Sequence, residues 1–266
     1  ERGDYEIDVP VEPPLGGPKY EHYQWESPTQ PWFVMAFRGP AFIATEKDMP
    51  ALDLVSEIYF SSSSDIYKDL VIENQFVDQL FGYFPNRKDP GMLIIAARLT
   101  DAEHAVAVRD AINETLTAAR TQLVDPAKVE ETKSRLRYSF TAGLGSSGNI
   151  GEMLATFVHY ERTPEIINDV YRSYDALTSE DVRTIANKYF VDDSRVTFTL
   201  SNDASMEGID GMTSLDELVA AAGMAEAAPV ATRADDAVDL PVPDVAPEDA
   251  TPVSFVAKPL ASSPLV

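Results

Sequence analysis

The sequence predicts an α+β domain: a mixed, largely antiparallel β-sheet with helices packed on one face. Two observations lead to this fold class. Between about residues 19 and 202, apolar residues recur with a period of two in some segments and of 3.6 in others, as strands and helices require. Strand-like segments come first, a run of helix-like segments follows, and one strand-like segment returns at the end.

Four segments have the apolar pattern of strands. Residues 31–37 and 91–99 are almost continuously apolar, which is typical of central strands covered on both faces. Residues 76–84 precede an Asp-Pro-Gly turn and should form a hairpin with 91–99. Residues 195–200 predict a strand with one wetter face, because two threonines, Thr197 and Thr199, alternate with Val196, Phe198 and Leu200.

The longest helical pattern has apolar residues at steps of three or four, and its stripe is Val108, Ile112, Leu116, Ala119 and Leu123. Asp125-Pro126 supplies an N-cap and a first-position proline for the next helix, with a stripe of Val129, Leu136 and Phe140. Further helices are expected at 48–60, around 150–158 and at 164–177. Another should follow Thr178, because Asp181 stands at capping-box spacing.

The two ends differ in composition from the body, residues 19–203. Residues 1–18 are rich in Pro and Gly and read as an incoming linker. Residues 204–250 are acidic and rich in Ala and Pro, which predicts a second linker. Within it, Ser214 and Glu217 have capping-box spacing and predict a short helix near 214–222. The last segment, 251–266, contains a β-prone run and could begin another domain.

Charge and composition exclude several classes of protein. The chain has 44 Asp and Glu against 21 Lys and Arg, a net charge of -23, which would repel nucleic acid and anionic membrane surfaces. It has no Cys, which excludes disulfides, a thiolate nucleophile, iron–sulfur clusters and Cys-ligated zinc. The longest apolar run, 92–97, is far shorter than the roughly 18 residues of a membrane helix. We therefore expect no nucleic-acid partner and no membrane insertion.

The three histidines predict no metal site. His22, His104 and His159 lie far apart in the sequence, and none has a second histidine at helical spacing. His159 and Glu161 would point away from each other on a helix, so a solvated helix end is the favoured interpretation.

Three further motifs have ordinary structural explanations. Gly143–Gly148 matches G-x-G-x-x-G, but a helix precedes it where a dinucleotide site needs a strand, so a connection between helices is expected. Ser61–Ser64 lacks a nucleophile elbow and reads as a loop and helix cap. Asn113-Glu114-Thr115 is a glycosylation sequon inside a predicted helix. The residues themselves thus indicate no catalytic, cofactor-binding or metal-binding group.

Several short motifs nevertheless occur in a specific order: MAFRGP at 35–40, PALDL at 50–54, SSDIYKDL at 63–70, RKDPG at 87–91, and LTSEDV at 177–182 leading to Tyr189-Phe190. Over roughly residues 19–202 this arrangement resembles the second, non-catalytic domain of the insulinase-like zinc metallopeptidases, the pitrilysin or M16 family. The resemblance implies an M16-like fold and a zinc motif, HxxEH, in a first domain that this chain does not contain.

The resemblance also implies that this domain has no catalytic residues. Some family members place an Arg and, seven residues later, a Tyr in a second-type domain, where they hold substrate and stabilise the oxyanion. The matching positions here are Val71 and Asp78. Valine has no donor, and a carboxylate would repel a developing oxyanion. The Arg/Tyr pair is therefore expected to be lost, and zinc is expected only in the parent's catalytic domain.

The resemblance implies a structural domain of a zinc metalloendopeptidase that cleaves unfolded peptides, with the parent's catalytic zinc domain and the peptide substrate as partners. In a four-domain parent, residues 204–250 would join the two halves and Val253–Val256 would begin the next domain. Family habit and the absence of Cys fit a bacterial periplasmic or envelope location.

Two alternatives stay open. One is a non-enzymatic scaffold or interaction subunit of the same family, which loss of HxxEH from the parent would indicate. The other is a free-standing module that binds an extended peptide at a strand edge.

Overall fold

The computed structural model describes residues 12–13, 15–161, 163–209 and 213–222. In this part of the chain, five strands form one sheet in the order β1-β5-β2-β4-β3. β1 and β5 pair in parallel, and all other neighbours are antiparallel. The strands are β1 (Lys19–Gln24), β2 (Trp32–Arg38), β3 (Val77–Tyr83), β4 (Met92–Leu99) and β5 (Val196–Ser201). The mixed, largely antiparallel sheet confirms the predicted fold class.

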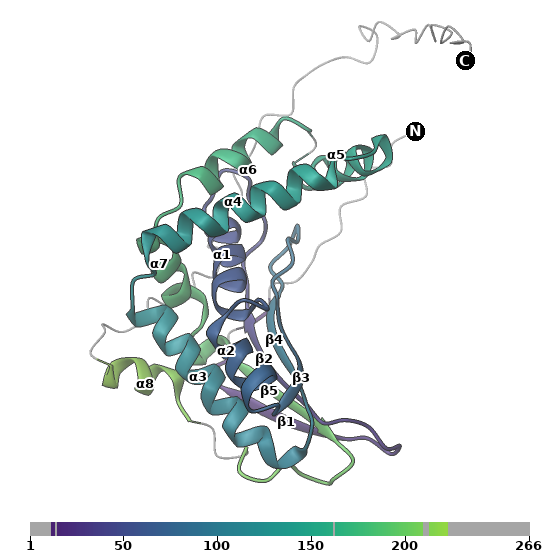
Figure 1. Cartoon of the computed structure of the whole chain (residues 1–266), viewed down its shortest axis with the longest axis vertical. Coiled ribbons are helices and arrows are strands. Elements are labelled where there is room, and N and C mark those ends of the chain that lie inside the picture. The colour runs from purple at the N-terminus through teal and green to yellow at the C-terminus, as the bar shows by residue number, and fades with distance from the viewer. Residues whose placement is uncertain (1–11, 14, 162, 210–212, 223–266) are drawn as a thin grey trace, which may run out of the picture. The chain divides into compact units, whose positions relative to one another are not determined.

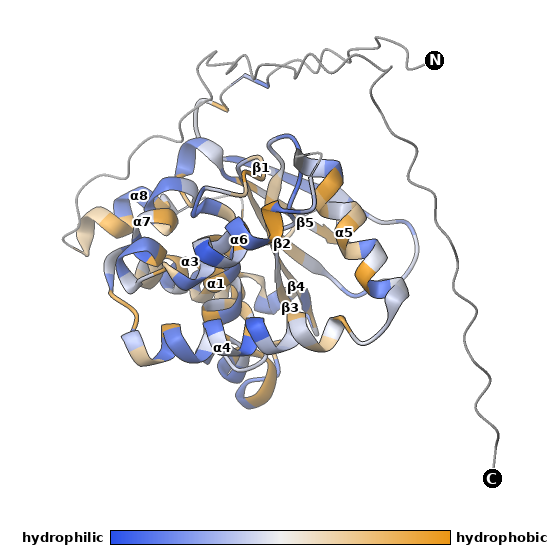
Figure 2. Ribbon diagram, turned by 90° about the horizontal axis from the view of Figure 1, so that it is seen from above, coloured by the Kyte–Doolittle hydropathy of each residue, from blue (hydrophilic) through white to orange (hydrophobic). Residues whose placement is uncertain are grey.

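Most helices lie on one side of the sheet (Figures 1 and 2). None of those that the structure describes is both long and apolar enough to span a bilayer. The helical elements are α1 (Asp48–Phe60), α2 (Asp65–Tyr67), the π-helical η1 (Lys68–Glu73), the 3₁₀ turn η2 (Ala102–His104), α3 (Ala105–Thr121), α4 (Pro126–Gly143), α5 (Ser147–Glu161), α6 (Ile166–Asp175), α7 (Ser179–Tyr189), the 3₁₀ turn η3 (Asp192–Ser194) and α8 (Leu215–Ala221).

The core lies between the sheet and α1, α3 and α7. Strand register places Phe33 and Met35 of β2 opposite Ala97 and Ile95 of β4, so these side chains share one face. All four are at most 1% exposed, and burial of each large side chain contributes roughly 1.5 to 3 kcal/mol. At Gly82 of β3, a Cβ atom would lie 2.9 Å from Ser56 Oγ of α1. The missing side chain thus lets α1 approach the sheet closely.

The predicted helix starts are confirmed. The Asp125 side chain accepts a hydrogen bond from the Ala127 N–H at the start of α4. Thr178 and Asp181 form a reciprocal capping box on α7. The predicted stripe of α3 extends too far, because the helix ends at Thr121 and the Leu123 side chain is 56% exposed.

The edge strand β1 was not among the four predicted strands. Its sequence, KYEHYQ, is too polar to show the apolar pattern of a strand. The strand is fixed by backbone pairing with β5 and by two side chains that bond to Thr199 Oγ1. Tyr20 OH lies 2.8 Å and His22 Nδ1 2.9 Å from that oxygen. β1 is therefore held in the sheet by polar contacts with a distant strand, and it lacks the apolar period by which a strand is identified from sequence.

The prediction of a linker from residue 204 is wrong for residues 204–209 and 213–222. Four apolar side chains of this segment are at most 2% exposed, and they are Met206, Ile209, Leu215 and Val219. The acidic composition predicted a linker, but Asp216 is paired with the buried Arg120. An acidic residue of this segment therefore helps to hold it against the core. The short helix predicted there is confirmed as α8, and Ser214 caps it. Most of the other predicted end segments, 1–11 and 223–266, lie outside the described residues.

Candidate functional site

The sheet face that points away from the core carries many apolar side chains. Residues opposite each other in register share a face, so Val34 of β2, Phe198 of β5 and Ala96 of β4 lie together on this side. We call this side the open face. Its apolar members are Tyr23, Trp32, Val34, Ala36, Phe81, Tyr83, Met92, Ile94, Ala96, Val196, Phe198 and Leu200.

Several members of the open face are well exposed. The side chains of Tyr23, Phe81, Tyr83 and Met92 have 37 to 53% of their area accessible. Val34, Ile94 and Phe198 at the centre are half-buried. The prediction that β2 and β4 are covered on both faces is therefore wrong for the described residues, which cover the other face with helices. An apolar surface of this kind typically marks an interaction site.

In β5, polar side chains face the core and apolar side chains face away from it, which is the reverse of the usual arrangement. Thr197 and Thr199 are at most 4% exposed and face the core, whereas Val196, Phe198 and Leu200 lie on the open face. The wetter face expected from the threonines is thus the buried one. The buried hydroxyl of Thr199 is satisfied by Tyr20 and His22 of β1. The apolar residues of β5 therefore contribute to the open face and not to the core.

Val71 and Asp78, the positions that the family resemblance assigns to an Arg and a Tyr, lie in different elements. Val71 is half-buried in η1 and packs against the core. Asp78 stands at a register irregularity of β3, and its carboxylate accepts two hydrogen bonds from Arg98 of β4, at 2.7 and 2.8 Å. These hydrogen bonds lower the pKa of Asp78. Asp78 is therefore held as a paired carboxylate.

The structure places the three histidines in separate elements. His22 on β1 uses both ring nitrogens, on Thr199 Oγ1 and on the Asp203 carbonyl. His104 stacks on Phe76 with ring centroids 4.4 Å apart. His159 is exposed on α5. Among the described residues, no group of three or more His, Asp or Glu side chains could hold a metal ion.

The remaining motifs have structural roles. Gly143–Gly148 connects α4 to α5, as expected. Ser64 caps α2 by accepting a hydrogen bond from the Tyr67 N–H. Asn113 of the sequon is 2% exposed on α3, so its amide is inaccessible to glycosylation in the folded chain. The open face is accordingly the candidate functional site. Its signal in the sequence was the continuous apolar character of β2 and β4 in a sheet with helices on one face.

Comparison with known proteins gives a consistent family assignment. The sequence model of the peptidase M16 inactive domain matches residues 5–136. A protease from Helicobacter pylori is similar in structure, with a TM-score of 0.64 and 22% identity over 75% of this chain and 49% of that chain. A peptidase M16 inactive domain from Pseudomonas fluorescens has a TM-score of 0.58 and 19% identity over 76% of this chain and 47% of that chain.

A third similar fold occurs in complex III2 from Candida albicans, with a TM-score of 0.56 and 17% identity over 73% of this chain and 49% of that chain. A comparison with curated proteins gives no match. The chain spans about half the length of the Helicobacter pylori and Pseudomonas fluorescens proteins. The sequence match and the shared fold agree, and the chain belongs to the peptidase M16 family as a member of its inactive, C-terminal-type domains.

Proposed function

We propose that this chain is a structural domain of an M16 zinc metalloendopeptidase and that its open face packs against the catalytic domain of the parent. Together the two domains would wall a chamber that admits unfolded peptides. The single observation that carries the proposal is the apolar open face. Side chains such as Val34, Ile94 and Phe198 would be shielded from water by a partner, and the apolar area removed from water would stabilise the assembly.

Catalysis would then depend on the partner domain. By family resemblance, that domain would hold a zinc ion and the Glu of HxxEH. The zinc would activate a water for attack on a peptide carbonyl. This chain would contribute the fixed wall against which the catalytic domain is held. Its strong net negative charge would favour basic peptides by electrostatic steering.

A scaffold without peptidase activity is the second candidate. The fold shared with complex III2 from Candida albicans supports it, because that protein is part of a larger assembly. The open face would serve both functions, so docking alone does not distinguish them. The presence or loss of HxxEH in the parent's first domain does.

The test is co-expression of this chain with the catalytic domain of the parent. Phe198→Glu places a charge at the centre of the open face and should abolish co-purification of the two domains. Tyr138→Glu is the matched control, because Tyr138 is 75% exposed on α4, away from the open face. Equal co-purification of both variants would contradict the proposed docking surface.

Peptidase activity of the complex separates the two candidates. The complex with zinc should cleave an unfolded, fluorogenic peptide, and Phe198→Glu should remove that activity together with the association. A stable complex that lacks activity with zinc present would instead support the scaffold.

A further inference from the structure

A second site lies among the helices, apart from the open face. It is a cavity of about 260 Å³. Its walls come from α1, α4, α5 and α6 and from the loops that follow β2 and β3. None of the open-face side chains lines it. Five of the twelve residues that line it are aromatic, and they are Phe42, Phe140, Phe157, Tyr171 and Tyr174.

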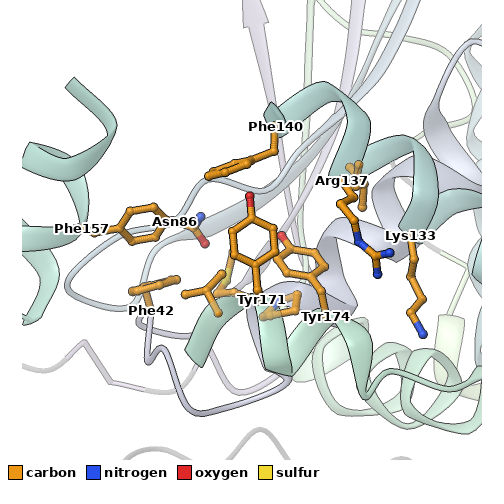
Figure 3. Close-up of a pocket in the computed structure, with 12 residues that line it drawn as sticks. Phe42, Asn86, Lys133, Arg137, Phe140, Phe157, Tyr171 and Tyr174 are labelled. Carbon is orange, nitrogen blue, oxygen red and sulfur yellow. The ribbon is translucent and has the colours of Figure 1, made fainter. Parts of the chain in front are cut away.

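The aromatic rings form two groups on different walls. Phe140 of α4 and Tyr171 of α6 make an edge-to-face contact, with centroids 4.7 Å apart. Phe42 contacts Phe157 of α5 at 6.3 Å and Tyr160 at 4.7 Å. Figure 3 shows Phe42 and Phe157 on one side of the cavity, and Lys133 and Arg137 on the opposite side. Rings arranged in this way leave both faces and edges for an inserted ring.

The two cations of the cavity are already neutralised. Lys133 Nζ donates to Glu130 Oε1 at 2.7 Å and to the carbonyls of Asp175 and Leu177 at 2.9 and 3.0 Å. These three bonds use all the donors of an ammonium group. Arg137 is paired with the carboxylate of Asp175. A charged ligand would therefore meet no uncompensated opposite charge.

The tyrosines of the cavity are neutral as well. Burial raises the pKa of Tyr171 to about 12, although Arg137 opposes this shift. The Tyr174 hydroxyl donates a hydrogen bond to the half-buried Asp53 carboxylate of α1, and burial together with this carboxylate raises the pKa of Tyr174. The lining thus combines aromatic side chains, neutral tyrosine hydroxyls and cations that are already paired. The volume of the cavity is slightly below that of ordinary small-molecule sites, so it suits a single ring system.

We propose that this cavity binds one uncharged aromatic ring system of the size of a phenyl or indole group. The ring comes either from a free aromatic molecule or from a Phe or Trp side chain of a peptide. The chemistry is the same in both cases: the ring packs among Phe42, Phe140, Phe157 and Tyr171. The α5 wall is held over the cavity by Phe157 and by Tyr160, whose hydroxyl donates to the Asn86 carbonyl at 2.9 Å.

Methionine-methyl NMR of the full chain tests the proposal. Met49 lines the cavity and is 2% exposed, whereas Met35 and Met206 are equally buried elsewhere and serve as internal controls. Titration with indole should shift the Met49 methyl resonance in a saturable way and leave the other two unchanged. Absence of a saturable Met49 shift would overturn the proposal, as would equal shifts at all three methionines.

Matched variants locate the ring. Val170→Phe fills the cavity and should abolish the saturable shift, whereas Val158→Phe makes the same change on α5 outside the lining. Phe140→Ala removes one wall and should weaken indole binding roughly threefold to tenfold. Tyr138→Ala, on the same helix but 75% exposed, should leave it unchanged. Unaltered binding by Val170→Phe would assign indole to another site and overturn the proposal.

Three probes test whether the bound ligand is uncharged and whether its ring comes from a peptide or from a free aromatic molecule. Indole should bind more tightly than indole-3-acetate, and the reverse order would contradict an uncharged ligand. Acetyl-Ala-Phe-Ala-amide distinguishes the sources. Tighter binding of this peptide than of indole assigns the ring to a peptide side chain, and binding of indole without the peptide assigns it to a free aromatic molecule.

Discussion

Arg120 on α3 and Asp216 on α8 form an ion pair in which Nη1 and Oδ1 are 2.7 Å apart and the Arg120 side chain is fully buried. The same Nη1 donates to the Phe190 carbonyl at 3.0 Å. The other oxygen of Asp216 accepts from the Asp192 N–H at 3.1 Å. Arg120 is thus one of the buried cations that fix the acidic segment beyond β5 to the core; Arg195, which donates to the Thr213 carbonyl at 2.8 Å, is another.

Asp216→Ala should lower the free energy of unfolding, because it leaves the Arg120 guanidinium buried without its carboxylate. We expect a loss of about 2 kcal/mol, less than for a fully buried pair, because the Asp216 side chain is 41% exposed. Urea denaturation measures the change. Glu217→Ala, an exposed neighbour on α8, is the control and should change stability by about 0.5 kcal/mol or less. Equal effects of the two variants would contradict a stabilising role for the pair.

Truncation tests whether α8 belongs to the domain. A chain that ends at Asp203 loses Met206, Ile209, Leu215 and Val219, which are all at most 2% exposed. At roughly 1.5 to 3 kcal/mol each, this burial approaches the total stability of a typical domain. The shorter chain should lack a cooperative thermal transition, whereas a chain that ends at Ala222 should retain one. Similar melting of both chains would show that the segment is dispensable.

Asp53 should make stability depend on pH. Burial, opposed by the hydrogen bond from Tyr174, raises the pKa of Asp53 from 3.8 to about 6. Between these values the folded state binds more protons than the unfolded state, so the contribution of Asp53 falls as pH rises from about 4 to 6. The loss should be about 2 to 3 kcal/mol above pH 6.

Asp53→Asn removes this titration. The variant should match the natural chain near pH 4 and be more stable than it at pH 7.5, as measured by denaturant unfolding at both values. Glu152→Gln, at an exposed site on α5, is the control for loss of a carboxylate. Its free energy of unfolding should equal that of the natural chain at both pH values. A stability difference for Asp53→Asn that is independent of pH would rule out the raised pKa.

Zinc binding tests the absence of a metal site in this chain. After incubation with zinc and desalting, plasma emission should detect no stoichiometric metal, because the three histidines occupy separate elements. A parallel sample without added zinc gives the background. Stoichiometric zinc would require a site built from His22, His104 or His159 with carboxylates and would overturn the prediction.

Much of the fold was predictable because its signals are local. The capping box of α7 and the Asp-Pro start of α4 depend on residues within one turn, and both are formed as expected. The apolar periods of β2 and β4 also identify those strands without further information. Where the signal was not local, prediction failed. β1 has no apolar period of its own, and its polar side chains are explained only by Thr199, far away in the sequence.

The sequence by itself determined most of the elements, their order and the family resemblance, because periodicity, caps and motifs depend on residues within short stretches of chain. Tertiary structure alone decided which side of each strand faces the helices. In β5 it buried Thr197 and Thr199 and turned Val196, Phe198 and Leu200 to the open face. Alternation of polar and apolar residues along a strand predicts two different faces, but it does not say which face packs against the core. The face that does so is set by strand pairing and by distant partners, such as β1 for the threonines and Arg120 for the acidic segment around Asp216.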